Sequence, residues 1–158
     1  MAAPIADQIV DFLRSIGLVV EERELTGPTI LPGITVDKGG IVIDREKLAY
    51  PGDLLHEAGH LAIVPKAERE GLSVNVGTNP GYEMGAIAWS YAASVHLGLP
   101  AEVVFHEQGY KGGAHALTQN FEGGHFIGYP MLVWRGLTDS PKSDSPTRYP
   151  AMKQWLCD

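Results

Sequence analysis

The pentapeptide HEAGH at residues 56–60 constrains the fold more than any other part of this sequence. Residues 53–64 are predicted to form a helix, because Asp53 follows a Pro-Gly pair as a candidate N-cap and Pro65 prevents the helix from continuing. Histidines four residues apart lie on the same face of a helix. The chain must therefore fold so that one helix face presents two imidazoles to a common site.

This pattern is typical of a metal centre. His56 and His60 can bind one cation, and Glu57 stands beside a water molecule that the cation holds. A zinc ion in a hydrolytic site takes three protein ligands and one water, so a third ligand is expected. The metzincin class is excluded, because Ile63 and Lys66 occupy the positions of its glycine and third histidine.

The third ligand is predicted to be Glu83, which opens an alanine-rich segment over residues 82–97. This segment is predicted to be a helix that another helix can approach closely. We expect one zinc ion per chain, bound by His56, His60 and Glu83. The alternatives for the third position are His106, His115 and His125.

The expected chemistry is hydrolysis of a carbonyl compound, with Glu57 as the general base that accepts a proton from the attacking water. The developing oxyanion then needs a hydrogen-bond donor. His115 and His125 are the favoured candidates, because they flank a glycine-rich stretch that suits a loop-rich wall of the site. Other side chains able to donate are Tyr82, Tyr91, His106, Tyr110 and Tyr129.

Hydrophobic spacing predicts the remaining elements. Residues 4–16 form an amphipathic helix, and β-branched triplets at 34–36 and 41–43 form a hairpin around a four-residue turn at 37–40. Candidate strands lie at residues 18–25 and 73–76, and helices are predicted at 114–122 and 150–156. A helical turn is predicted at 100–105, a buried segment at 127–134 and a surface loop at 138–150.

These elements predict an α+β fold: a minimal zincin-like domain in which a small antiparallel sheet packs on the HEAGH helix and on a second helix carrying Glu83. The C-terminal third is expected to be helical and rich in loops. With 158 residues, the chain is expected to form a single domain, with a core at residues 4–97 and an extension at residues 98–158.

Composition excludes several classes of partner. The formal net charge of -7 disfavours binding to nucleic acid or anionic lipid, and no apolar run is long enough to span a membrane. The N-terminal apolar stretch is interrupted by charges, so we expect no signal peptide and a cytoplasmic location. The single cysteine, Cys157, excludes an internal disulfide and a thiolate metal cluster.

The sequence resembles the small gluzincins related to the ImmA/IrrE metallopeptidases. The matching text is GGIVIDREKLAYPGDLLHEAGHLAI at residues 39–63, followed by EMGAIAWSYAA at residues 83–93, within an overall resemblance over residues 4–97. Carried over by position, the resemblance implies that His56, His60 and Glu83 are zinc ligands and that Glu57 is the base.

The sequence thus predicts a zinc-dependent metallopeptidase that acts on a peptide or protein substrate. The alternative is a catalytically silent zinc-binding domain of the same fold that serves as a protein-interaction module. Retention of Glu57 favours the enzyme, because a purely structural zinc site closes with four protein ligands and needs no base. The sequence leaves the oligomeric state open.

Overall fold

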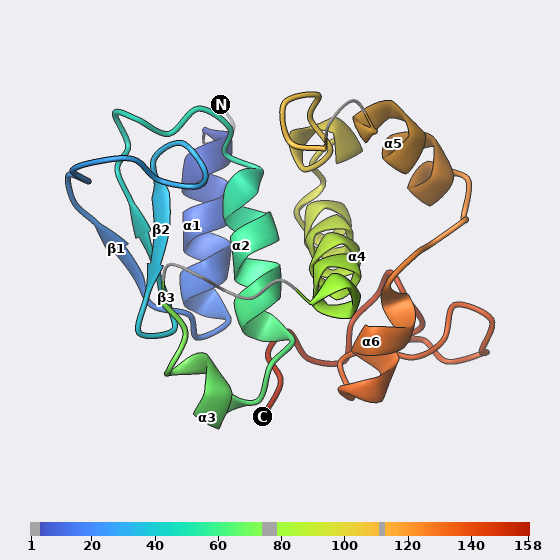
Figure 1. Ribbon diagram of the computed structural model, residues 1–158. Coiled ribbons are helices and arrows are strands. Elements are labelled where there is room, and N and C mark those ends of the chain that lie inside the picture. Colours follow the sequence, from blue (N-terminus) through green and yellow to red (C-terminus); the bar gives the residue numbers. More distant parts are fainter. Residues whose placement is uncertain (1–3, 74–78, 111–112) are drawn as a thin grey trace.

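The fold was analysed in a computed structural model, which describes residues 4–73, 79–110 and 113–158 (Figure 1). The helices are α1 (Ile5–Ser15), α2 (Asp53–Ala62), α3 (Lys66–Arg69), α4 (Pro80–Leu97), α5 (Ala114–Glu122) and α6 (Tyr129–Trp134), with a 3-10 turn η1 (Ala101–Val103). The strands are β1 (Val20–Glu22), β2 (Ile34–Asp37) and β3 (Gly40–Ile43). The chain therefore has an α+β fold, with the sheet on one side of α1 and α2 and with α4 and α6 on the other (Figure 1).

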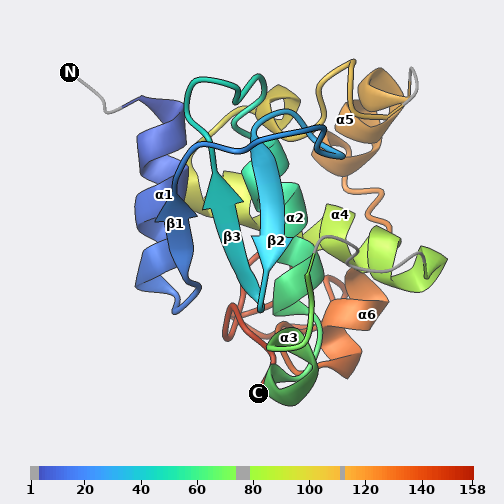
Figure 2. The same cartoon turned by 60° about the vertical axis from the view of Figure 1, so that its left-hand side comes forward.

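The three described strands form a mixed sheet of order β1-β3-β2, as Figure 2 shows. The predicted hairpin of β2 and β3 is antiparallel, but β1 runs parallel to β3, with Val20 opposite Ile41. The expectation of a purely antiparallel sheet is therefore wrong. Every residue of β3 is buried, as is typical of a central strand, and the long connection at residues 23–33 carries the chain from β1 past β3 to β2 at the other edge of the sheet.

The hairpin turn is shorter than expected. Asp37 pairs with Gly40, so the turn contains only Lys38 and Gly39, with φ angles of 50° and 77°. Two successive residues with positive φ are typical of a two-residue hairpin turn, whose twist matches that of the strands. The predicted four-residue turn at 37–40 is therefore wrong.

The HEAGH helix is confirmed as α2, and it buries an apolar stripe. The stripe consists of Leu54, Leu55, Ala58, Leu61 and Ala62, each with an exposed fraction of 0%. On the other side, α2 lies very close to α4 at Gly59: a Cβ atom there would be 2.8 Å from the carbonyl oxygen of Ala86. This close approach brings the face with the histidines against the first turns of α4.

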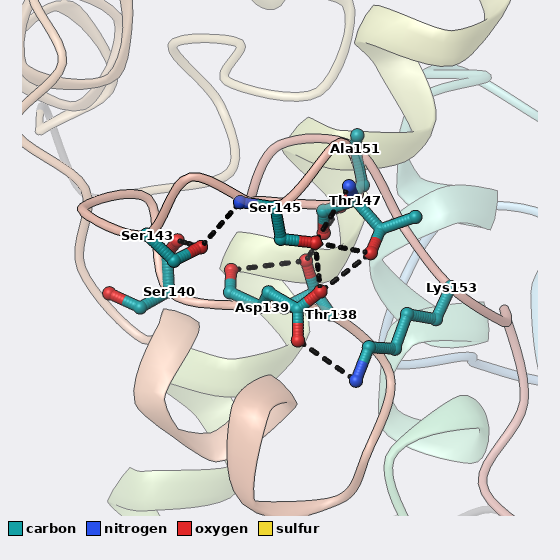
Figure 3. A network of polar contacts seen from close by, with 8 residues as sticks. All are labelled: Thr138, Asp139, Ser140, Ser143, Ser145, Thr147, Ala151 and Lys153. Atoms are coloured by element: carbon teal, nitrogen blue, oxygen red, sulfur yellow. Dashed lines mark hydrogen bonds and ion pairs between the residues drawn. The ribbon is translucent and has the colours of Figure 1, made fainter.

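The C-terminal third is only partly as expected. The helix predicted at 114–122 is confirmed as α5, and the 100–105 turn contains η1. Residues 127–134 contain α6, which is not wholly buried, because Trp134 is 69% exposed. Residues 138–150 form a loop in which Asp139 accepts hydrogen bonds from Ser145 and Thr147 and pairs with Lys153 (Figure 3).

The helix predicted at residues 150–156 is wrong. Backbone groups of this segment bond to distant elements instead of to one another. The Lys153 N–H donates to Leu137 O, and the Trp155 carbonyl accepts a hydrogen bond from Trp89 Nε1 at 2.9 Å. Next to this segment, the Cys157 N–H donates to Ala62 O at the end of α2. Tertiary hydrogen bonds thus replace the helical pattern here.

Two further expectations concern a strand at residues 73–76 and membrane-spanning segments. The strand predicted at 73–76 falls mostly on residues outside those that the structure describes. Among the described residues, no helix has both the length and the apolar character that crossing a membrane requires.

Candidate metal centre

Two helices bring three ligand-type side chains together. His56 Nε2 lies 3.0 Å from Glu83 Oε1, and His60 Nε2 lies 2.8 Å from Glu83 Oε2. The histidines come from successive turns of α2, and Glu83 comes from the start of α4. One ligand atom from each residue lies within 4.8 Å of the other two. This group could hold a metal ion, as the spacing of the three residues predicted.

Electrostatics tie the three side chains together. Hydrogen bonds from His56 and His60 lower the pKa of Glu83 strongly, against the opposing effect of burial. Burial disfavours the protonated form of His56, but its hydrogen bond to Glu83 and the charges of Glu83, Glu57 and Asp53 outweigh this, so its pKa is raised. The Glu83 carboxylate is therefore charged and contacts both imidazole rings.

The residues fit a divalent cation. Two imidazole nitrogens and one carboxylate form a donor set that leaves a coordination position for water or substrate. The histidines are well shielded, with side-chain exposures of 14% for His56 and 5% for His60, whereas the Glu83 side chain is 47% exposed. The site is thus closed by protein on the α2 side and open on the α4 side.

Glu57 lies between the two histidines in α2 and is half-buried. Burial raises its pKa, the nearby imidazoles of His60 and His56 oppose this effect, and the carboxylates of Glu83 and Asp53 add to it. A pKa moved towards neutrality suits a carboxylate that must accept a proton and then release it.

Tyr110 was not singled out by the sequence pattern, although it was among the side chains able to donate. Its hydroxyl lies 3.1 Å from His56 Nδ1, and the two rings meet edge to face. Burial raises the pKa of Tyr110 above its ordinary value, and the charges of Glu83 and Asp53 reinforce this, so the phenol keeps its proton. No local signal indicates this contact, because 54 residues separate the two side chains.

His106 was an alternative third ligand, and the structure pairs its Nε2 with Asp53 Oδ1 at 2.6 Å. Asp53 was expected to be the N-cap of α2, but Gly52 holds that position and no side chain caps it. Asp53 is instead the first residue of the helix, and its carboxylate binds the imidazole. His106 therefore lies beside the metal-ligand group without joining it.

The structure does not bring His115 or His125 to this group. Both residues are exposed, one in the first turn of α5 and the other just after this helix. Among the residues that the structure describes, no hydrogen bond or ion pair joins either of them to His56, His60 or Glu83. Their predicted role as oxyanion donors has no support from the geometry.

The other tyrosines named as possible oxyanion donors contact other parts of the protein. Tyr82 accepts a hydrogen bond from Arg135 at 3.1 Å. Tyr91 packs among the rings of Phe105 and Phe121, and Tyr129 stacks on Tyr149. Tyr110 is therefore the aromatic hydroxyl that lies next to the ligand group.

Comparison of the chain with protein-family models, with curated proteins and with solved structures gave no match. Resemblance to the small gluzincins stays a prediction from the sequence motifs. The geometry of the three ligands is thus the main ground for any functional proposal.

Proposed function

We propose that this protein is a zinc-dependent peptidase with a zincin-like fold. The observation that carries the proposal is the convergence of His56 Nε2, His60 Nε2 and the Glu83 carboxylate, with Glu57 beside them on α2. Two histidines and a glutamate are the protein ligands of zinc in several hydrolytic enzymes, and the remaining position is left open in such sites.

A zinc ion held here would polarise a peptide carbonyl and lower the pKa of a coordinated water to about 7. The role of the protein side chains is then to transfer protons. Glu57 accepts the proton of the attacking water and transfers it to the nitrogen of the leaving amine, so that the C–N bond breaks and the carboxylate is regenerated. Its raised pKa favours the first of these transfers, because a carboxylate of higher pKa is the stronger base.

The chain also orients the proposed ligands. The buried stripe of α2 fixes the helix against the core, so the histidine side chains have little freedom to turn away. Glu83 is placed by the close packing of α2 on α4 at Gly59. A site built on two packed helices holds its geometry better than one built on loops.

Glu57→Gln tests the proposal. The amide preserves the shape of the side chain but cannot accept a proton, so zinc should stay bound at one equivalent while peptide hydrolysis is lost. The matched control is Glu122→Gln, which changes an exposed glutamate at the end of α5 and should leave hydrolysis intact.

The assay compares zinc content and the cleavage of a diverse peptide mixture for the wild type and both variants. Zinc-loaded wild type that cleaves nothing, with Glu57→Gln indistinguishable from it, would replace the peptidase with the alternative, a zinc-binding interaction module.

A further inference from the structure

The segment after η1 runs along the N-terminal half of α2; residues 103–110 are here called the 103–110 arm. Three successive contacts join the two elements. A Cβ atom at Gly52 would lie 1.8 Å from Val103 O, so only glycine permits this approach. Further along, His106 binds Asp53, and Tyr110 reaches His56.

The middle contact anchors the arm. The side chains of His106 and Asp53 are only 14% and 8% exposed, and a short hydrogen bond to a carboxylate is stronger than one between neutral groups. The His106 ring also stacks on Tyr50, with centroids 4.2 Å apart and planes 12° apart. The His106 ring thus holds the arm through two contacts, the hydrogen bond to Asp53 and the stacking on Tyr50.

The end of the arm is fixed by aromatic packing. Phe105 is 2% exposed and packs against Phe121 of α5, with ring centroids 5.2 Å apart. The Tyr110 ring meets Phe105 edge to face at 5.8 Å. These contacts leave the Tyr110 hydroxyl at the His56 ring, where it lies within hydrogen-bond distance of Nδ1.

We propose that Tyr110 is a positioning residue for the metal ligand His56: its hydroxyl holds Nδ1 so that Nε2 faces the ion, and the His106–Asp53 pair holds the arm that carries it. This inference rests on the metal centre of the proposed function, but it does not require peptide hydrolysis.

The chemistry of a ligating imidazole explains the need for such a partner. When Nε2 binds a cation, the ring proton resides on Nδ1, and a hydrogen bond from this N–H fixes both tautomer and orientation. A hydroxyl can accept that hydrogen bond and can also donate one, unlike a carboxylate or a carbonyl. Tyr110 can therefore hold the ring both with the ion and without it, when Nε2 contacts Glu83.

The test uses Tyr110→Phe, which removes the hydroxyl and keeps the ring against Phe105. The matched control is Tyr129→Phe, which removes a hydroxyl from a ring that stacks on Tyr149. Zinc affinity is measured by competition with a chromophoric chelator, and the visible spectrum of the cobalt-loaded protein reports the coordination geometry. We expect Tyr110→Phe to weaken zinc binding by about 10- to 100-fold and to alter the cobalt spectrum, with the control unchanged.

The role of the anchor is tested with His106→Ala, alone and combined with Tyr110→Phe. If the anchor acts through Tyr110, the single variant weakens zinc binding and the double variant is no weaker than Tyr110→Phe alone. Losses that multiply in the double variant would show that His106 supports the site by another route.

The outcomes separate the two proposals. Wild-type affinity and an unchanged cobalt spectrum in Tyr110→Phe, or an equal loss in Tyr129→Phe, overturn the positioning role. Failure of the wild-type protein to bind zinc or cobalt overturns the metal centre, and the positioning role with it. Weakened zinc binding in Tyr110→Phe, together with absence of peptide cleavage by the wild type, supports the positioning role and contradicts only the peptidase.

Discussion

Gly59→Ala is expected to destabilise the protein although it adds a better helix former to α2. In an open helix position, this change would stabilise by about 1 kcal/mol. Here the new methyl group would lie 2.8 Å from Ala86 O and 3.0 Å from Ala86 Cα, which are backbone atoms that cannot rotate away. Overpacking of this kind costs about 1–3 kcal/mol, and a backbone contact belongs to the upper part of that range. The net loss is therefore about 1–2 kcal/mol.

The assay is urea unfolding of the metal-free protein, followed by tryptophan fluorescence. Gly85→Ala is the matched control, because its new methyl group would meet side chains and no backbone, with Met131 Cγ at 2.8 Å and Ile63 Cδ1 at 3.2 Å. Gly85→Ala should lower the free energy of unfolding less than Gly59→Ala does, since side chains can shift where the backbone of Ala86 cannot. A Gly59→Ala protein as stable as the wild type, or more stable, would refute the close packing of α2 on α4 that places Glu83.

Two further predictions concern stability. Hydrogen bonds from Lys153, Ser145 and Thr147 lower the pKa of Asp139 to about 2. The charged carboxylate therefore stabilises the fold above about pH 4, and this contribution is lost as the pH falls towards 2. In acid titrations followed by circular dichroism, the stability difference between wild type and Asp139→Asn should shrink over that interval. Arg69→Met should cost about 2–4 kcal/mol in urea unfolding, because the buried guanidinium donates to the carbonyls of Leu61, Val64 and Cys157. Arg45→Met removes ion pairs with Asp7 and Glu22 that are exposed to solvent, so it should cost less, about 1 kcal/mol. Equal losses in the two variants would contradict this account.

Local patterns allowed the candidate metal ligands to be predicted. The spacing of His56 and His60, and a proline that ends the helix, are signals within a dozen residues. Glu83 was found because a zinc site requires a third ligand and the alanine-rich helix offers one at its start. Its contacts with both histidines in the structure agree with that reasoning.

Long-range pairing could not be predicted in the same way. The connection at residues 23–33 carries the chain from β1 across to β2, and nothing within β1 specifies that it pairs with β3 in the parallel direction. The helix propensity of residues 150–156 is overcome by hydrogen bonds to Leu137 and Trp89, which lie far away in the sequence. Tyr110 reaches His56 across 54 residues of sequence, whereas the glycine-rich stretch led the prediction to His115 and His125.

The most direct test of the metal centre is a zinc titration of chelator-stripped wild type and Glu83→Ala. Glu83 supplies the carboxylate that both histidines contact, and its removal leaves two ligands where a hydrolytic zinc site needs three. We predict one equivalent of tightly bound zinc in the wild type and severely weakened binding in Glu83→Ala. Wild type that binds no zinc, or Glu83→Ala that binds it with unchanged affinity, would contradict the proposed site.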